Sequence, residues 1–129
     1  MSGVIAAGTC LARLGDIADG GTRVVDLNPE EFPPLTGLLV RQGEQVHAFL
    51  NRCPHAGRPL GLGSSRLVTP DGELLQCLAH GALFEKYTGL CVAGPCVDDS
   101  LRRLPVAVVC GEVRLAEDLD TRELSRGPW

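Results

Sequence analysis

Two short pairs of cysteine and histidine carry the chemistry of this sequence: Cys53 with His55, and Cys77 with His80. Each pair places a thiolate sulfur beside an imidazole nitrogen, and both groups are ligands for transition metals. Two loops that each offer one sulfur and one nitrogen can hold a site of two irons, with the thiolates on one iron and the imidazoles on the other. The residues therefore indicate a redox cofactor rather than a catalytic side chain.

The spacing of the two pairs suits loops that approach each other. One residue separates the ligands of the first pair, two separate those of the second, and the 21 residues from Ala56 to Gln76 lie between the pairs. A gap of this length lets two hairpin tips converge from opposite sides. Gly57 and Gly81 follow the histidines, where a Cβ could obstruct a close backbone approach.

A zinc ion is the competing occupant of the same four ligands. Two cysteines and two histidines form a known structural zinc set, and tetrahedral geometry suits that ion. Zinc fingers, however, usually pair cysteine with cysteine and histidine with histidine, on a hairpin and a helix. Because each pair here is mixed and no helix pattern follows, the two-iron site is favoured. Unrelated core or surface roles for the four residues are the weakest interpretation.

Short β-rich segments separated by turn residues must position these ligands. The sequence has 16 glycines and 9 prolines, and its apolar runs are brief. Three hairpins are predicted: residues 38–41 and 46–50 around Gln42-Gly43-Glu44, residues 66–68 and 73–76 around Pro70-Asp71-Gly72, and residues 106–109 and 113–115 around Gly111-Glu112. This pattern predicts an all-β domain of packed antiparallel sheets. The best helix candidate is the short stretch Glu117 to Ser125.

Length and composition indicate one soluble, acidic domain over residues 1–129. The chain has 129 residues, 44% of them hydrophobic, a net charge of −4 and a pI near 5.3. This balance argues against nonspecific nucleic-acid binding, which needs a basic surface, and aromatic residues are only 4%. No segment reaches the ~18–20 apolar residues that a membrane helix needs, and Met1 to Cys10 lack the features of a signal peptide. We expect no membrane span and a cytoplasmic location.

Three segments resemble the cluster-binding motifs of Rieske-type ferredoxins: residues 51–57, residues 77–84 and residues 88–95. The last segment is similar to a proline-containing loop that shields the cluster in that family. The similarity covers about residues 35–110. It implies a Rieske iron–sulfur fold, with packed antiparallel sheets and two cluster-binding loops at one end. It also implies one [2Fe–2S] cluster, with Cys53 and Cys77 on one iron and His55 and His80 on the other.

The resemblance also suggests a low reduction potential. High-potential Rieske proteins of cytochrome bc-type complexes carry two further cysteines that form a disulfide, and Ser and Tyr hydroxyls that donate to cluster or ligand sulfur. The corresponding positions here are Arg58, Ala79, Ala82 and Phe84. Since hydrogen bonds to sulfur stabilise the reduced cluster, we expect a midpoint in the low part of the range, about −150 mV and below 0 mV.

The function implied is that of a soluble electron carrier, which passes single electrons from a flavin reductase to an acceptor such as an oxygenase. The chain is not expected to be an enzyme, because His47 alone cannot supply the two histidines and one carboxylate of a mononuclear iron site. Two alternatives remain. One is a non-catalytic Rieske subunit of a larger reductase, similar to small subunits of nitrite reductases. The other is a redox sensor that uses the cluster or the thiols of Cys91 and Cys96.

The residues outside the ligand pairs have ordinary structural interpretations. The cysteines that remain are predicted to be buried apolar thiols, with a Cys91–Cys96 bridge as the alternative; these are Cys10, Cys91, Cys96 and Cys110. His47 is expected to be a strand residue, and Arg102-Arg103 an ordinary surface pair. Apolar residues near the ligands are expected to exclude water from the cluster or to contact a partner; these are Pro54, Leu60, Leu62, Leu78 and Pro95.

Overall fold

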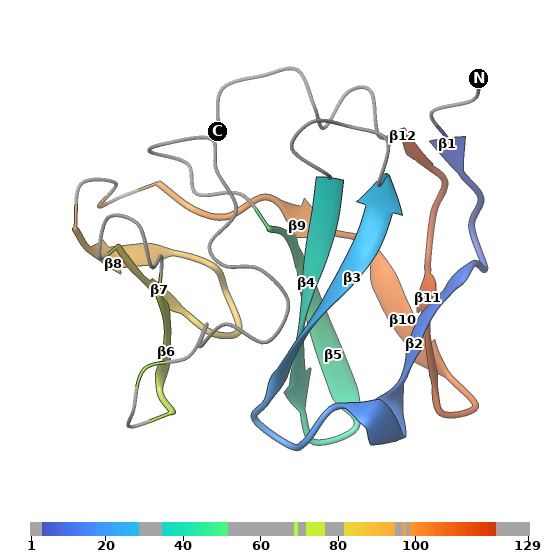
Figure 1. Cartoon of the computed structure of the whole chain (residues 1–129), viewed down its shortest axis with the longest axis horizontal. Helices are drawn as coiled ribbons and strands as arrows, with labels where there is room; N and C mark the ends of the chain where they lie inside the picture. Colours follow the sequence, from blue (N-terminus) through green and yellow to red (C-terminus); the bar gives the residue numbers. More distant parts are fainter. Residues whose placement is uncertain are drawn as a thin grey trace.

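Short strands make up most of the chain that can be described (Figure 1). The computed structural model describes residues 4–28, 35–51, 69, 72–76, 82–94, 97 and 99–120. Its strands are β1 Val4–Ile5, β2 Cys10–Arg13, β3 Thr22–Asn28, β4 Leu35–Gln42, β5 Gln45–Leu50, β6 Leu74–Gln76, β7 Leu83–Glu85, β8 Cys91–Ala93, β9 Arg103–Leu104, β10 Val106–Val109, β11 Glu112–Leu115 and β12 Leu119–Asp120. One 3₁₀ turn, η1, spans Leu14–Asp16.

The described strands form antiparallel sheets, which confirms the predicted all-β class. The central sheet has the order β3-β4-β5-β9, a second sheet has the order β10-β11-β2, and a small sheet has the order β6-β7-β8. Strands β1 and β12 form a two-stranded ribbon. In Figure 1 the central sheet lies between the two three-stranded sheets, with the small sheet on one side and β10-β11-β2 on the other.

The central sheet buries side chains on both faces, because successive residues of a strand point to opposite sides. On β4, Leu39 belongs to a first core shared with β10-β11-β2, whereas Leu38 and Val40 belong to a second core shared with the small sheet. All three are fully buried. A run of consecutive apolar residues is what a strand covered on both faces requires.

The first core is mainly aliphatic and the second contains the described phenylalanines. The buried members of the first core are Ala12, Ile17, Val25, Leu27, Leu39, Val46, Ala48, Leu50, Leu104, Val113, Leu115 and Leu119. Those of the second are Leu38, Val40, Phe49, Leu75, Ala82, Phe84, Cys91 and Leu101. The second core is therefore built around two aromatic rings, one from the central sheet and one from the small sheet.

Two predicted hairpins can be compared directly with the structure. The predicted hairpin around Gln42-Gly43-Glu44 is confirmed, but the strands pair up to Gln42 and Gln45, so the turn is only Gly43-Glu44. In the β10–β11 hairpin Val109 pairs with Glu112, so the turn is Cys110-Gly111 and the prediction of Gly111-Glu112 was wrong by one residue. Cys110 and Gly111 both have positive φ, 52° and 75°, which is the conformation of a type I′ turn.

The third predicted turn is supported at its two ends. The amide of Gly72 donates to the carbonyl of Thr69 at 2.8 Å, and the amide of Thr69 donates to the carbonyl of Leu74 at 2.8 Å. Leu74 to Gln76 form β6, as predicted. Residues 66–68 lie outside the described residues.

The helix predicted to begin at Glu117 is wrong in the described part of that stretch. Leu119–Asp120 form β12, which pairs antiparallel with Val4 and Ile5 of β1. Leu119 is buried in the first core. A helix of nine residues is marginal alone, so pairing with a distant strand and burial of Leu119 override the local preference. No helix in the described ranges is long and apolar enough to cross a membrane.

Candidate metal centre

The four predicted ligands, Cys53, His55, Cys77 and His80, lie outside the described residues. The strand ends that precede each Cys/His pair and the strand that follows the second pair are described. Both loops start from strands that pack around the second core. The candidate site is therefore built up from the ends of these strands.

The first ligand loop starts at the end of β5. The amide of Leu50 donates to the carbonyl of Arg102 at 2.7 Å, and the amide of Asn51 donates to the carbonyl of Thr36 at 3.0 Å. The Asn51 side chain is buried and its Nδ2 donates to Oγ1 of Thr36 at 3.0 Å. These bonds fix the backbone direction two residues before Cys53, since a buried polar side chain with good partners has few alternative positions.

The second ligand loop connects two paired strands. In the β6–β7 ladder Gln76 pairs with Leu83, Leu75 with Phe84 and Leu74 with Glu85. Cys77 directly follows β6, and His80 precedes β7 by two residues. Both predicted ligands of the second pair thus lie in sequence between two paired strands, which place Leu75 and Phe84 in the second core.

The third segment of the resemblance approaches the second ligand loop closely at Gly94. A Cβ built on Gly94 would lie 2.8 Å from Cα of Ala82, and Gly94 has φ of 97°. Real Cβ atoms do not approach other carbon atoms so closely, so a larger residue here would push the two segments apart. The end of β8 therefore packs backbone against backbone on Ala82, two residues after His80.

The side chains around these loop ends are apolar. Ala82 and Phe84, which stand at the two positions where high-potential Rieske proteins carry hydroxyls, are both fully buried in the second core. Arg58 and Ala79, which stand at the positions of the two disulfide cysteines, lie outside the described residues. Neither described position can donate a side-chain hydrogen bond to sulfur.

The donor set fits a [2Fe–2S] cluster with unlike irons. Two thiolates and two imidazoles are the ligands of such a cluster, and each loop begins or ends at a hydrogen-bonded strand of the second core. The close approach of Gly94 to Ala82 leaves no room for a Cβ, so the end of β8 is held against the residue that precedes β7.

The comparison with protein families decides the matter. Residues 8–110 match the family model described as the Rieske [2Fe-2S] domain. The chain belongs to the Rieske [2Fe–2S] domain family. A Rieske domain binds a [2Fe–2S] cluster, which agrees with the mixed Cys/His pairs.

Several known proteins are similar to this Rieske domain. Ferredoxin CarAc of Metapseudomonas resinovorans is 30% identical over 79 residues, which cover 61% of this chain and 64% of that ferredoxin. The chain is thus matched over somewhat less than two-thirds of that relative. The ferredoxin of carbazole 1,9a-dioxygenase from Nocardioides aromaticivorans IC177 is 26% identical, with a TM-score of 0.63, over 87% of this chain and 99% of that one.

A further structural match is the complex of reduced oxygenase and oxidized ferredoxin in carbazole 1,9a-dioxygenase. Its matching chain is 26% identical, with a TM-score of 0.64, over 87% of this chain and 94% of its own length. The terminal oxygenase of carbazole 1,9a-dioxygenase from Novosphingobium sp. KA1 matches over only 31% of its length, at 23% identity and a TM-score of 0.68. That last likeness concerns the fold alone.

His47 of this Rieske domain is a strand residue with both ring nitrogens in hydrogen bonds. Its Nε2 lies 2.8 Å from Oε1 of Gln42, and its Nδ1 lies 3.2 Å from Nη1 of Arg103. Partial burial and, secondly, the Arg103 guanidinium lower the pKa of His47 below its ordinary 6.5. Among the described residues, no three metal-binding side chains gather at one point.

Arg103 has a larger structural role than the sequence indicated. Besides His47, it contacts the carbonyl of Tyr87, to which its Nη2 donates at 2.6 Å, and its guanidinium lies 5.1 Å from the centre of the Phe49 ring. The prediction of an ordinary surface pair for Arg102-Arg103 missed this. The apolar residues Leu101 and Leu104 on either side of the two arginines were a signal for a strand. No local pattern in the sequence identifies Tyr87 or His47 as partners of Arg103.

Lys86 is a second basic residue that sequence analysis missed. It is only 8% exposed, which is unusual for lysine. Its Nζ donates to the carbonyl of Gly72 at 2.9 Å and lies 5.4 Å from the centre of the Tyr87 ring. The turn between β7 and β8 is thus joined to the residues just before β6.

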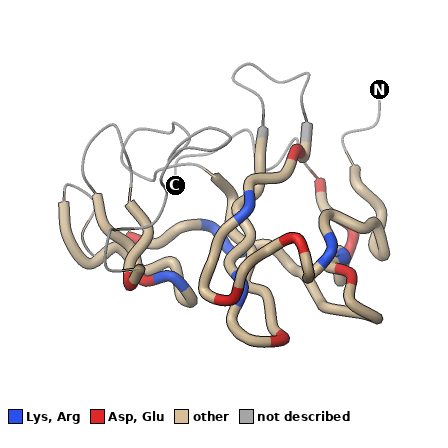
Figure 2. Tube along the Cα trace, turned by 60° about the horizontal axis from the view of Figure 1, so that its bottom comes forward, with Lys and Arg blue, Asp and Glu red and all other residues tan. Residues whose placement is uncertain are grey.

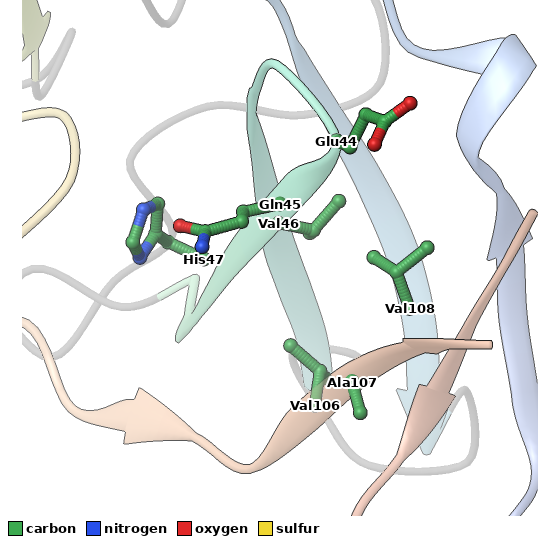
Figure 3. Close-up of a pocket in the computed structure, with 7 residues that line it drawn as sticks. All are labelled: Glu44, Gln45, Val46, His47, Val106, Ala107 and Val108. Carbon is green, nitrogen blue, oxygen red and sulfur yellow. The ribbon is translucent and has the colours of Figure 1, made fainter.

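A shallow surface cavity of about 300 Å³ lies between β5 and β10. Val46, Val106 and Val108 line it, and Figure 3 shows the His47 ring directed away from these valines. The other lining residues are Glu44, Gln45 and Ala107. Its polar groups do not converge on one point, so the cavity lacks the arrangement of a small-molecule site.

The cysteines outside the ligand pairs divide into two kinds. Cys91 is buried in the second core and its Sγ donates to the carbonyl of Ala93 at 3.2 Å, as the prediction of a buried thiol requires. Cys10 and Cys110 are free thiols, as predicted, but both are exposed, so the predicted burial was wrong for them. Cys10 lies at the start of β2 and Cys110 in a turn, where burial is not available. Cys96 lies outside the described residues, so its bridge to Cys91 is not tested.

The apolar residues predicted near the ligands, Pro54, Leu60, Leu62, Leu78 and Pro95, lie outside the described residues. Among the described apolar residues, Leu90, Val92 and Val97 lie in or near β8 in the sequence and have exposed fractions between 42% and 51%. Figure 2 shows acidic and basic residues interspersed along the described trace rather than gathered in one region of a single sign.

Proposed function

We propose that this chain is an electron carrier with one low-potential Rieske [2Fe–2S] cluster, bound by Cys53 and Cys77 at one iron and by His55 and His80 at the other. The observation that carries the proposal is the arrangement of the second core. The end of β5, the β6–β7 hairpin and the end of β8 pack around it, and both Cys/His pairs extend from these elements. Residues 1–129 are proposed to form a single domain.

The bound cluster supplies the chemistry, the uptake and release of one electron. The residues of the chain hold and shield it. Asn51 fixes the approach to the first loop through its bonds to Thr36, and the hydrogen-bonded β6–β7 ladder fixes the second. Firmly held strand ends beside the ligands suit electron transfer, because little rearrangement of these strands then accompanies the change of charge. No substrate turnover is expected from this chain alone.

The proposed acceptor is an oxygenase and the proposed donor a flavin reductase. Support comes from the relatives: one structural match is the ferredoxin of a dioxygenase, and another is a complex of reduced oxygenase and oxidized ferredoxin. The same relatives favour a free carrier over a fixed subunit of a larger reductase. We expect the protein to act as a soluble component of the cytoplasm.

A low potential follows from the side chains at the hydroxyl positions. Ala82 and Phe84 are buried and apolar, so neither stabilises the extra negative charge of the reduced cluster. We expect a midpoint near the lower end of the Rieske range, about −150 mV. A redox titration followed by visible circular dichroism measures it. A midpoint above about +100 mV would contradict the low-potential part of the proposal.

Metal analysis and electron paramagnetic resonance test the cofactor itself. The purified protein is expected to contain iron and inorganic sulfide in equal amounts, about two of each per chain. Reduction with dithionite should give the rhombic signal of a Rieske cluster with a low average g value. Zinc in place of iron, or a cluster signal typical of four sulfur ligands, would overturn the proposed function.

A further inference from the structure

One hydrogen bond joins the central sheet to the turn between β7 and β8, and two contacts within that sheet support it. Arg103 of β9 donates through Nη2 to the Tyr87 carbonyl and contacts Nδ1 of His47 through Nη1. His47 of β5 contacts Gln42 at the end of β4. We refer to the side chains of Arg103, His47 and Gln42, with the Tyr87 carbonyl, as the Arg103 clasp. Its members come from four separate places in the sequence.

The hydrogen-bond roles within the clasp define the protonation state of His47. A guanidinium has only donors, so Nδ1 of His47 must accept the bond from Arg103 at 3.2 Å. In the neutral tautomer with Nδ1 unprotonated, Nε2 carries the hydrogen and donates a hydrogen bond to Oε1 of Gln42 at 2.8 Å. A second proton on His47 would place an N–H and a positive charge against Arg103. The clasp is therefore complete only with a neutral imidazole.

Close packing beneath the clasp makes its position critical. The Phe49 ring under the Arg103 guanidinium is fully buried. A Cβ on Gly89 would lie 2.8 Å from Cε1 of that ring. The backbone of the β7–β8 turn therefore rests directly on the ring of Phe49, and the clasp holds the same turn at Tyr87 from the outside.

A further contact joins the turn to the residues before β6. Lys86, next to Tyr87, donates to the Gly72 carbonyl at 2.9 Å. Gly72 lies two residues before β6, and Cys77 directly follows that strand. On the other side, β7 leads back toward His80. These contacts lie at the end of the β6–β7 ladder opposite the connection that contains Cys77 and His80, so a shift of the β7–β8 turn would reach that connection through β6 and β7.

We propose that Arg103 is a positioning residue for the metal centre, which holds the β6-β7-β8 sheet on the central sheet and does so fully only while His47 is neutral. The proposal rests on the proposed function in taking Cys77 and His80 as ligands. The groups that face His47 from the elements packed against it are Arg103 of β9, Tyr87 of the β7–β8 turn and Gln42 of β4. The lowered pKa of His47 agrees with this arrangement.

Two substitutions of Arg103 test the positioning role in the intact holoprotein. Hydrogen exchange by mass spectrometry follows residues 82–94, with the β3–β4 hairpin as the internal reference. Arg103→Gln should raise the exchange of residues 82–94 about tenfold and change the visible circular dichroism of the cluster. Arg103→Lys should restore less than half of the protection, because one ammonium does not reproduce the two-pronged geometry. Arg23→Gln, at an exposed residue of β3, controls for the lost charge.

A pH series separates a positioning role from a merely structural one. After correction for intrinsic exchange, protection of residues 82–94 should fall in the wild-type protein as the pH drops below about 6.5, the ordinary pKa of histidine. In His47→Gln this step should be absent. The proposal is overturned if Arg103→Lys behaves like wild type, if Arg103→Gln changes nothing, or if the step persists in His47→Gln. The metal content, measured separately, decides on the proposed function, whereas exchange reports on the clasp whichever metal is bound.

Discussion

The two cores of the molecule are held together in different ways. Around the first core, β3, β4 and β5 are strands of 7, 8 and 6 residues that form long ladders. Around the second core, β6, β7 and β8 have 3 residues each. The small sheet depends instead on close backbone contacts at Gly89 and Gly94 and on the bonds of Lys86 and Arg103. The second pair of proposed ligands thus extends from the part with fewer ladder hydrogen bonds, which is the part expected to open locally first, whereas the first pair follows the long strand β5.

The largest effect is expected from removing a proposed ligand. Cys77→Ala should abolish the rhombic electron paramagnetic resonance signal and the visible absorption, because one iron loses a thiolate. The first core contains none of the proposed ligands, so the far-ultraviolet circular dichroism of the central sheet should largely persist. Cys110→Ala, at an exposed thiol in a distant turn, is the matched control and should keep its cluster. An unchanged signal in Cys77→Ala would remove this residue from the ligand set.

Two neighbouring leucines of β4 compare the cores directly. Leu38 and Leu39 are both fully buried, Leu38 in the second core and Leu39 in the first. Each change to alanine should lower the free energy of unfolding by about 2–5 kcal/mol, as measured by denaturant titration. Only Leu38→Ala should also speed the loss of visible absorption from the folded holoprotein. Equal rates of cluster loss in the two variants would show that the cores do not differ in this respect.

Two glycines with positive φ separate backbone strain from steric overlap. Gly43 has φ of 61° and open space around it, whereas Gly89 has φ of 77° and a Cβ added to it would lie 2.8 Å from the Phe49 ring. Gly43→Ala should cost about 1 kcal/mol of unfolding free energy from strain alone. Gly89→Ala should cost about 3 kcal/mol because the turn must also move off Phe49. Thermal and urea unfolding measure both, and equal costs would argue against tight packing at Gly89.

The smallest effect concerns pH. The pKa of His47 is lowered in the folded state, so the folded protein binds fewer protons there than the unfolded chain does. The resulting stabilisation is complete above pH 6.5, the ordinary pKa, and is lost as the pH falls through the lower folded-state pKa. For this partly exposed side chain we expect under about 1 kcal/mol. Urea titrations of the wild-type protein and His47→Gln from pH 5 to 8 give the difference in unfolding free energy, which should be constant near neutral pH and shrink toward pH 5.

Local pattern was sufficient to predict much of this fold. Alternating apolar residues around Gly43 predicted the β4–β5 hairpin, and the mixed Cys/His pairs indicated the family that the comparison confirms. The turn at Cys110 was misplaced because a cysteine with positive φ is not expected from its residue type. The strand at Leu119 was missed because its partner, β1, lies at the opposite end of the sequence.

Long-range polar contacts were equally out of reach from sequence. Arg102 and Arg103 are identical in type, and only the pairing of Arg103 with Phe49 places the second guanidinium above that ring. Lys86 is buried because the carbonyl of Gly72 accepts from it, and that contact depends on how the small sheet folds back. Such partners are set by tertiary structure, since the residues involved are 14 or more positions apart.

The strand shared by both cores restricts how this protein can diverge. Leu38, Leu39 and Val40 have no solvent-facing side on which polar replacements could accumulate, whereas Ala107 and Val109 of β10 are exposed. In a saturation mutagenesis library screened for the visible absorption of the proposed cluster, positions 38–40 should accept few amino acids. Positions 107 and 109 should accept many. Substitutions would then accumulate in outer strands such as β10, whereas the sequence of β4 would change most slowly.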